Sequence, residues 1–338
     1  MNERFNNAIN KIPQNTPPIW CMRQAGRYHS HYQKLRAKFS FVDLCKIPTV
    51  AAQVALGPVE DFDFDVAILF SDLLFPLEAL GFGLTYGEKG PVLDKALSSA
   101  VLSSLKNPAD AVKDLIFQQH ALIETKKILP KDKSLIGFVG GHATLYNYAC
   151  GTKTERLLEA KKNLTLAPKF LEILTEFLIY NIELQLNGGA EVVMMFDSSA
   201  AWYSPRLYKE LFLPHLKTIA KKFPKKIGYY MRGGTETHLN DPIFYNDFVG
   251  LGVDHRYDLN QYLKLEPRGF VQGNFDETLL HCVPEELKKH IDNFANTVKY
   301  LSPDERKGWI CGLGHGVTPE TPEGNMRIFV ERIRELFS

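Results

Sequence analysis

The segment Met22–Tyr28, with the sequence MRQAGRY, follows the apolar run Pro18–Cys21 and carries Arg23 and Arg27 four residues apart. Guanidinium groups bind carboxylates and phosphates through paired hydrogen bonds, and Gly26 lets a ligand approach the backbone closely. The pattern therefore predicts a binding site for a ligand with several anionic groups. The alternative interpretation is the first turn of a helix whose arginines are solvated.

Any preference for anions has to be local, because the chain of 338 residues has a formal net charge of only +1. Such a charge favours neither nucleic acid nor an anionic membrane surface, and we expect no partner of either kind. The hydrophobic fraction of 45% is ordinary for a globular protein with a full core.

The cysteines are an odd number and include no Cys-x-x-Cys pair: Cys21, Cys45, Cys150, Cys282 and Cys311. That arrangement argues against a disulfide framework and fits a reducing compartment. The chain begins MNERFNN, which contains no apolar signal core, and no long uncharged apolar run follows. We therefore expect a cytoplasmic protein without a membrane span.

Short apolar runs alternate with segments of helical period along most of the chain. Most of these runs are continuously apolar, which is typical of parallel strands buried on both faces. The predicted strands are Ile19–Met22, Val66–Phe70, Leu135–Val139, Glu191–Phe196, Ile227–Met231, Val253–Asp258, Gly269–Gln272 and Trp309–Leu313. The predicted helices between them include Pro168–Leu186, Pro205–Lys222, Pro284–Leu301 and Pro322–Phe337.

This alternation of strands and helices predicts an α/β fold, a (β/α)8 TIM barrel that forms a single domain over residues 1–338. A doubly wound open sheet is the alternative, because counting strands does not show whether the sheet closes. The segment Gly81–Ala111 is rich in glycine and less regular, and we expect a long loop or hairpin there. Thr321 is the predicted N-cap of the last helix, with Pro322 at its first position.

Polar or glycine-rich turns follow almost every predicted strand, at the end where a barrel builds its active site. They are Arg23–Arg27, Ser71–Asp72, Gly140–Thr144 with Tyr146 and Tyr148 beyond, Asp197–Ser199, Arg232–Gly234, His255 with Asp258, Gly273–Asp276 and Gly314–Gly316. A whole set of such turns on one face predicts a single concave site.

Individual residues of this set also have purely structural interpretations. Asp72 can cap the helix that follows it, and Ser198 can act as an N-cap. Tyr148 can fill the core with its hydroxyl bonded to backbone. His315, between two glycines, can be satisfied by backbone groups.

Three other chemistries lack their sequence signals. The run Cys311–Gly316 is rich in glycine but does not keep the G-x-G-x-x-G spacing of a dinucleotide site. No pair of histidines or cysteines has the short spacing of metal ligands, so we expect no metal. No G-x-S-x-G motif marks a nucleophilic serine.

Five segments together resemble uroporphyrinogen decarboxylase, in that family's order and over nearly the full chain. They are Met22–Tyr28 (MRQAGRY), Phe70–Asp72 (FSD), Phe196–Ser198 (FDS), Gln272–Asn274 (QGN) and Gly314–Pro322 (GHGVTPETP). The resemblance implies a barrel with a deep cleft, and a homodimer whose two clefts face each other.

The resemblance also implies a carboxy-lyase of haem and related tetrapyrrole synthesis. Such an enzyme decarboxylates the four acetate side chains of uroporphyrinogen III to methyls, giving coproporphyrinogen III. By motif match, the implied substrate-binding residues are Arg23, Gln24, Ala25, Gly26, Arg27, Asp72, Tyr148, Ser198 and His315. Asp72 matches the family's transition-state stabiliser. Because a protonated pyrrole is itself the electron sink, no cofactor is expected.

The identity of the proton donor stays open in this interpretation. Arg23 is the candidate by position, although a guanidinium with a pKa above about 12 is a reluctant acid. Tyr148, His315 or a water held by an arginine are the alternatives.

The chain departs from the family pattern at three places. Gly140–Thr144 stands where the family usually has Gly-Ala-Pro-Trp-Thr, Phe275–Glu277 where it usually has Leu-Asp-Pro, and Ser199 where it often has Trp. We expect these changes to alter the pocket wall.

Two other functions stay open. One is a zinc-dependent barrel methyltransferase, although Tyr230–Gly234 lacks the His-x-Cys pair that such an enzyme needs. The other is a non-catalytic tetrapyrrole-binding paralogue.

Overall fold

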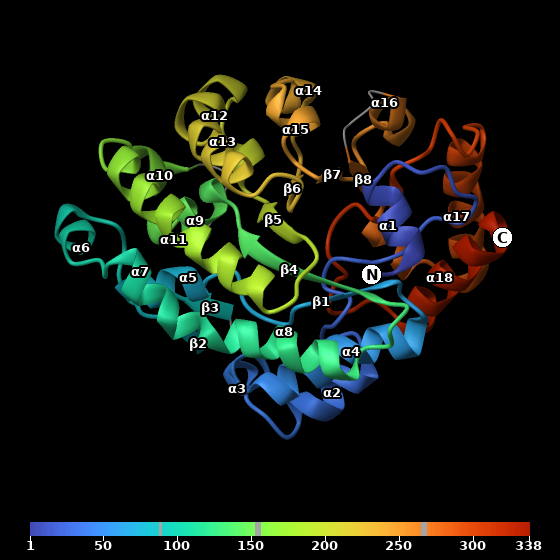
Figure 1. Cartoon of the computed structure of the whole chain (residues 1–338), viewed down its shortest axis with the longest axis horizontal. Coiled ribbons are helices and arrows are strands. Elements are labelled where there is room, and N and C mark those ends of the chain that lie inside the picture. The colour runs from blue at the N-terminus through green and yellow to red at the C-terminus, as the bar shows by residue number, and fades with distance from the viewer. Residues whose placement is uncertain (88–89, 153–156, 265–268) are drawn as a thin grey trace.

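The computed structural model describes residues 1–87, 90–152, 157–264 and 269–338. Within them, seven strands form one curled parallel sheet in the order β1-β4-β5-β6-β7-β8-β9, with helices around it (Figure 1). These strands are β1 (Val66–Ile68), β4 (Ser134–Gly140), β5 (Val193–Asp197), β6 (Ile227–Met231), β7 (Gly250–Gly252), β8 (Phe270–Phe275) and β9 (Trp309–Leu313). Because consecutive strands are parallel neighbours, their C-terminal ends share one face of the molecule.

The helices fall into a group before β4, a group between β4 and β7, and a group after β7. The first group is α1 (Glu3–Ile9), α2 (Ser30–Arg36), α3 (Phe41–Lys46), α4 (Pro48–Phe62), α5 (Phe75–Leu77), α6 (Ser99–Ser103), α7 (Pro108–Ala111) and α8 (Ile116–Ile128). The second is α9 (His142–Ala149), α10 (Leu158–Lys162), α11 (Ala167–Asn187), α12 (Pro205–Leu211), α13 (Leu213–Lys222), α14 (Glu236–Leu239) and α15 (Ile243–Asn246). The third is α16 (Leu259–Lys264), α17 (Pro284–Lys299) and α18 (Glu323–Phe337).

Alternate residues of the strands pack on opposite faces of the sheet, as the period of two requires. In β5, Met194 and Phe196 belong to an inner apolar cluster, whereas Val193 and Met195 pack into the cluster shared with the helices. Phe5 of α1 also joins the inner cluster, together with Val66 at the start of β1. Helix α1 therefore fills the sheet interior near the N-terminal ends of the strands and leaves the opposite end for a cavity.

The α/β class and the parallel sheet are confirmed, but the predicted first strand, Ile19–Met22, does not form. Ile19 makes a single parallel bridge to Cys311 of β9, and on its other side the Asp65 amide donates to its carbonyl over 3.0 Å. Side chains take two further backbone groups: the Ile19 amide donates to the Asp65 carboxylate and the Cys21 amide to the Gln24 side-chain oxygen. The segment thus lies between β9 and β1 without the regular ladder of a closed eight-stranded barrel.

Two further boundaries differ from the prediction because of local turn chemistry. Strand β7 ends at Gly252, before the predicted Val253–Asp258, because Asp254 starts a turn by accepting from the Arg256 amide over 3.0 Å. The predicted helix Pro205–Lys222 is two helices, α12 and α13, joined at Phe212. Pro214 lacks the amide hydrogen that a continuous helix would need there.

The start of the last helix was predicted one residue too early. Pro322, not Thr321, is the N-cap of α18, and the Thr321 hydroxyl bonds to that of Thr318 instead.

The predicted loop or hairpin over Gly81–Ala111 contains both a hairpin and helices. Strands β2 (Thr85–Gly87) and β3 (Gly90–Val92) pair antiparallel, and α6 and α7 follow. Residues 88 and 89 of this segment lie outside the described residues. Across the described part of the chain, no helix combines the length and the apolar character needed to cross a membrane.

Candidate active site

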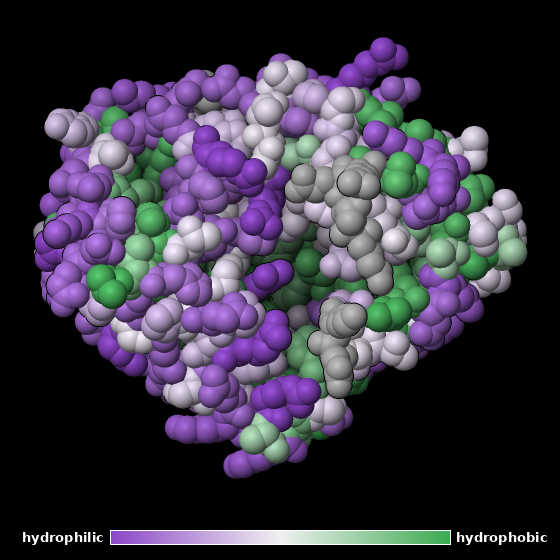
Figure 2. Space-filling model, turned by 180° about the vertical axis from the view of Figure 1, so that it is seen from behind, coloured by the Kyte–Doolittle hydropathy of each residue, from purple (hydrophilic) through white to green (hydrophobic). Residues whose placement is uncertain are grey.

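A cavity of about 450 Å³ lies at the C-terminal end of the sheet. Figure 2 shows a hollow in the molecular surface with hydrophobic residues at its base and hydrophilic residues around much of its rim. Most of the predicted site residues line this cavity: Arg23, Ala25, Gly26, Arg27, Asp72, Tyr148, Ser198 and His315. The fold therefore brings together residues that are almost 300 positions apart in the sequence.

Gln24 is the predicted site residue that does not line the cavity. Its side chain is fully buried and bonds backbone on both sides. Its amide nitrogen donates to the Val66 carbonyl over 2.9 Å, and its oxygen accepts from the Cys21 amide over 3.1 Å. Gln24 thereby fixes the turn that presents its two neighbours, Arg23 and Ala25, to the cavity.

Both arginines of this turn are exposed, and neither forms an ion pair with any described residue. The Arg23 side chain runs close to Gly316, where a Cβ atom would lie only 2.6 Å from Arg23 Cδ. A glycine at 316 therefore makes room for Arg23. Two unpaired guanidiniums on one cavity create a local field that favours a polyanionic ligand.

Asp72 is the acid among the residues that line the cavity. One of its oxygens accepts from the Leu74 amide over 2.7 Å, and this hydrogen bond fixes the carboxylate. Asp72 is not the N-cap of α5, because Leu74 occupies that position. Burial raises the pKa of Asp72, and the Leu74 hydrogen bond and the Arg23 charge partly offset this rise. The cavity thus holds a poorly solvated acid whose charge a cationic or hydrogen-bond-donating ligand would stabilise.

His315 is held by Tyr230 at the cavity wall. The Tyr230 hydroxyl lies 3.0 Å from His315 Nδ1 and 2.8 Å from the Gly314 carbonyl, and the two rings stack. Burial, together with the nearby charges of Arg232 and Arg23, lowers the pKa of His315 to about 3. At neutral pH His315 is therefore a neutral imidazole, with Nε2 left for a ligand.

Tyr148 lies on α9, whose start is fixed by the end of β5. The buried Asp197 carboxylate accepts from the amide and the hydroxyl of Thr144, each over 2.8 Å. Tyr148 itself is 39% exposed, so it is not core filler. Its pKa is raised, first by burial and then by the charge of Asp72. Ser198 also lines the cavity, and Ser199 rather than Ser198 is the N-cap of the next short helix.

Sequence reasoning missed Tyr86, which lies on β2 of the hairpin. Its hydroxyl is buried and interacts with Asp72, and its ring packs on Phe41 and Phe75. The phenol also counteracts the rise in the pKa of Asp72. No motif marks Tyr86, because a lone tyrosine in a glycine-rich stretch resembles any turn residue.

The remaining walls are mainly apolar. The side chains that give this character include Phe41, Ile68, Leu69, Phe70, Leu73, Phe138, Phe196 and Val317. Arg23, Arg27 and Asp72 are the charged residues among those that line the cavity, with neutral His315 beside them. The site thus pairs apolar walls with two cationic groups and one carboxylate.

The departures from the family pattern, which we expected to alter the pocket wall, lie outside the described lining of the cavity. None of Gly140–Thr144, Ser199 or Phe275–Glu277 is among the described residues that line the cavity. His142, for example, is fully buried against Thr175, with Nε2 3.1 Å from the hydroxyl.

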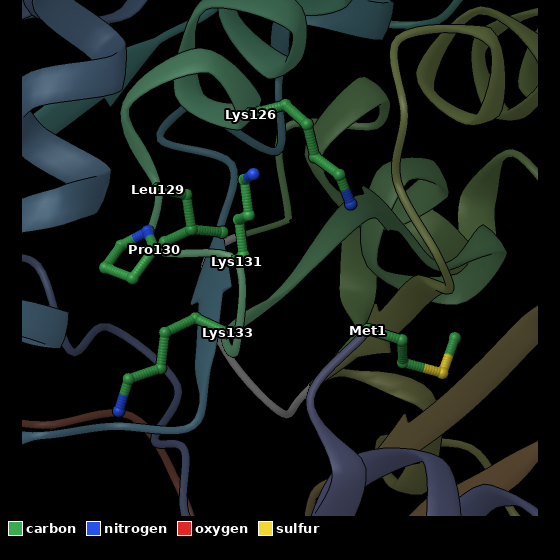
Figure 3. A pocket seen from close by; sticks show the side chains of 6 residues that line it. All are labelled: Met1, Lys126, Leu129, Pro130, Lys131 and Lys133. Atoms are coloured by element: carbon green, nitrogen blue, oxygen red, sulfur yellow. The ribbon is translucent and has the colours of Figure 1, made fainter.

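A second, smaller pocket of about 160 Å³ lies near the start of β4 (Figure 3). Its lining includes three lysines, two of which already pair with acids. Lys126 lies 3.0 Å from Glu191 and Lys133 lies 2.5 Å from Asp63. Their ammonium groups point in different directions in Figure 3, so this pocket lacks the converging unpaired groups of the first cavity.

The chain matches a family model described as uroporphyrinogen decarboxylase (URO-D) over residues 1–336. It is 34% identical to a uroporphyrinogen decarboxylase of Myxococcus xanthus over 342 residues, covering 98% of this chain and 96% of that one. It is also 34% identical to a uroporphyrinogen decarboxylase of Orientia tsutsugamushi over 344 residues, covering 98% of each chain.

Solved structures with lower sequence identity share the fold. A methyltransferase from Methanosarcina mazei superposes with a TM-score of 0.79 at 20% identity, covering 99% of this chain and 98% of that one. A B12-independent methionine synthase from Shewanella sp. W3-18-1 gives a TM-score of 0.51 at 11% identity, covering 88% and 91%.

Proposed function

The chain belongs to the uroporphyrinogen decarboxylase family, and we propose that it converts uroporphyrinogen III to coproporphyrinogen III by decarboxylating the four acetate side chains. It is a carboxy-lyase of tetrapyrrole biosynthesis. The observation that carries the finer proposal is one cavity with apolar walls, two guanidiniums that pair with no described acid, and a poorly solvated carboxylate.

The substrate is complementary to these groups. Its macrocycle is apolar, its acetate and propionate arms are anionic, and its four pyrrole N–H groups point inward. We assign the arms to Arg23 and Arg27, which bind carboxylates bidentately, and the N–H groups to Asp72. Tyr148, Ser198 and the free Nε2 of His315 supply further polar contacts around the ring, and Ala25 and Gly26 leave room for it.

Each decarboxylation replaces a carboxylate by a proton. Protonation of the pyrrole carbon next to the acetate arm makes the ring cationic. The electron pair of the C–CO₂ bond then flows into that ring, carbon dioxide leaves, and an exocyclic methylene remains. A second proton converts the methylene to methyl, and the ring carbon returns the first. Asp72 stabilises the ring in its two cationic forms, before carbon dioxide leaves and after the methylene is protonated, because a fixed carboxylate acts most strongly where water is excluded.

The side chains around the cavity differ in how readily they can donate a proton. His315 is uncharged at neutral pH because its pKa is lowered to about 3, and the raised pKa of Tyr148 makes its phenol a weaker acid. Arg23 stays the candidate by position, either through its guanidinium or through a water that it holds. It lies close enough to Asp72 for its charge to influence that carboxylate.

The remaining features of the proposal concern architecture and assembly. We assign the segment Pro18–Cys21 to the eighth position of a (β/α)8 barrel, supported by its single bridge to β9 and its hydrogen bond to the residue before β1, and we assign residues 1–338 to one domain. The protein is a cytoplasmic homodimer that uses no cofactor, which rests on the family resemblance. The five free cysteines are compatible with a reducing compartment.

An anaerobic assay tests the proposed function. Purified protein is incubated with uroporphyrinogen III under reducing conditions, and the products are separated by their number of carboxylates. The proposal requires loss of four carboxylates and formation of coproporphyrinogen III. Binding without turnover would favour the non-catalytic paralogue, and methyl transfer that depends on zinc would favour the methyltransferase.

A further inference from the structure

Three potential metal ligands lie at the ends of two neighbouring strands. His255 follows β7, and Asp276 and Glu277 directly follow β8. Strands β7 and β8 pair in parallel, with Gly252 opposite Gln272. The parallel register therefore brings together side chains that are more than 20 residues apart in the sequence.

The contacts within this cluster are loose ion pairs, at distances that also suit ligands around an ion. His255 Nδ1 lies 3.8 Å from Asp276 Oδ1 and 3.5 Å from Glu277 Oε2. One ligand atom from each residue falls within 4.8 Å of the others. Ligands at about 2.0–2.2 Å from a tetrahedral metal are themselves separated by about 3.3–3.6 Å, so small side-chain shifts would complete such a site.

Glu277 gives the second, independent indication of a ligand. The residue is only 3% exposed, and its Oε2 is buried without a hydrogen-bond partner among the described residues. Its ion-pair contact with His255 Nδ1 is a loose one, at 3.5 Å, and a buried carboxylate with such weak compensation costs several kcal/mol. Glu277 also stands where the family usually has proline, so the shared decarboxylation chemistry does not account for this acid.

The described charges around the two acids compensate them only weakly, through His255 at 3.8 and 3.5 Å. Arg256, whose charge reaches Glu277, is bound to Asp254 at 2.7 Å, and that pair cancels its own charge. Asp276 is held in position by the amide and hydroxyl of Thr278, over 2.9 and 2.7 Å. His255 and Asp276 are each about 30% exposed, so an ion and its waters can enter from solvent.

We propose that His255, Asp276 and Glu277 bind a divalent first-row transition-metal ion, with water completing its coordination. One imidazole and two carboxylates suit Zn²⁺, Mn²⁺ or Co²⁺ better than Ca²⁺ or Mg²⁺, which prefer oxygen ligands alone. None of the three residues lines the cavity, so the ion takes no part in the loss of carbon dioxide.

The bound ion would instead brace one side of the active site. A Cβ atom at Gly314 would lie 2.5 Å from the His255 amide nitrogen, so the chain before His315 packs directly against the proposed site. An ion that joins the ends of β7 and β8 should therefore raise thermal stability without changing the chemical step.

Metal titration of the full-length protein tests the proposal without reference to activity. After treatment with a chelator, Zn²⁺ is titrated by calorimetry and Co²⁺ by visible absorption. We expect one ion per chain, d–d bands without a thiolate charge-transfer band, and a higher melting temperature with Zn²⁺. Glu277→Gln should weaken Zn²⁺ affinity at least tenfold, whereas the exposed control Glu285→Gln should leave it unchanged.

Other outcomes would overturn the proposal. They are an absence of saturable binding, equal affinity in Glu277→Gln and the wild type, or binding that Cys282→Ser abolishes. Because Glu277 is buried, circular dichroism checks that its variant folds, and His255→Gln, at a more exposed ligand, provides a second measurement. Failure of metal binding would leave the decarboxylase function untouched, since the anaerobic assay tests that separately.

Discussion

Replacing Asp72 by asparagine removes the cavity's carboxylate while keeping its shape. The asparagine oxygen can still accept from the Leu74 amide, which lies 2.7 Å from the present oxygen. Loss of one preorganised charged group in an active site costs about 3 kcal/mol of transition-state stabilisation. Since about 1.4 kcal/mol corresponds to a factor of ten in rate, we expect kcat to fall about 100-fold or more.

The same substitution should not destabilise the protein at neutral pH. Burial raises the pKa of Asp72 above its usual value of 3.8, so the folded state holds a poorly solvated charge once the pH exceeds the folded-state pKa. Asparagine removes that cost. The stability difference should therefore be full above the folded-state pKa and should vanish as the pH falls below the unfolded-state value.

Two assays on the same preparations separate function from folding. Turnover of uroporphyrinogen III is followed anaerobically, and thermal unfolding is recorded between pH 4 and 8. The exposed Asp247→Asn, which also loses one carboxylate, serves as the control. Turnover within threefold of the wild type would refute the role of Asp72, and a melting temperature several degrees lower at pH 7.5 would refute the account of its burial.

Arg27→Ala should raise KM about 10- to 100-fold, as expected for loss of about 1.5–3 kcal/mol of charge-assisted hydrogen bonding, and Arg27→Lys should have an intermediate KM. An unchanged KM would show that Arg27 does not bind a substrate carboxylate. Gly316→Ala should displace the Arg23 side chain, because the new Cβ would lie 2.6 Å from Arg23 Cδ, and should lower kcat/KM by tenfold or more. Normal kinetics would show that activity does not depend on the present conformation of the Arg23 side chain. Exhaustive chelation should leave kcat within a factor of two, and a strict zinc requirement would instead favour a methyltransferase. Tyr86→Phe should raise the pKa of Asp72 further, because the phenol lowers this pKa in the wild type. The acid limb of the pH profile of kcat/KM should therefore move to higher pH. An unchanged acid limb would show that Tyr86 does not influence the ionisation of Asp72.

Much of the site follows from sequence because parallel strands end on one face. Once Val66–Phe70 and Glu191–Phe196 are recognised as strands, Asp72 and Ser198 have to lie near each other. Gln24 shows the limit of this reasoning. A motif match does not reveal whether an amide faces ligand or backbone, and here both of its polar atoms hold backbone.

Strand boundaries depended on interactions that a local pattern does not show. Ile19–Met22 has the composition of a strand, but Asp65 and Gln24 bind two of its backbone amides from outside the segment. The cluster of His255 and Glu277 was missed for a related reason. Short ligand spacing is the usual sign of a metal site, whereas the register of β7 and β8 assembles this one.

The structure of the complex with the product, coproporphyrinogen III, bound under anaerobic conditions would test the central claim most directly. The account predicts the macrocycle against the apolar walls, its four pyrrole nitrogens within about 2.7–3.2 Å of the Asp72 carboxylate, and carboxylate arms on Arg23 and Arg27. A macrocycle bound with its nitrogens away from Asp72, or with neither arginine touching an arm, would contradict it.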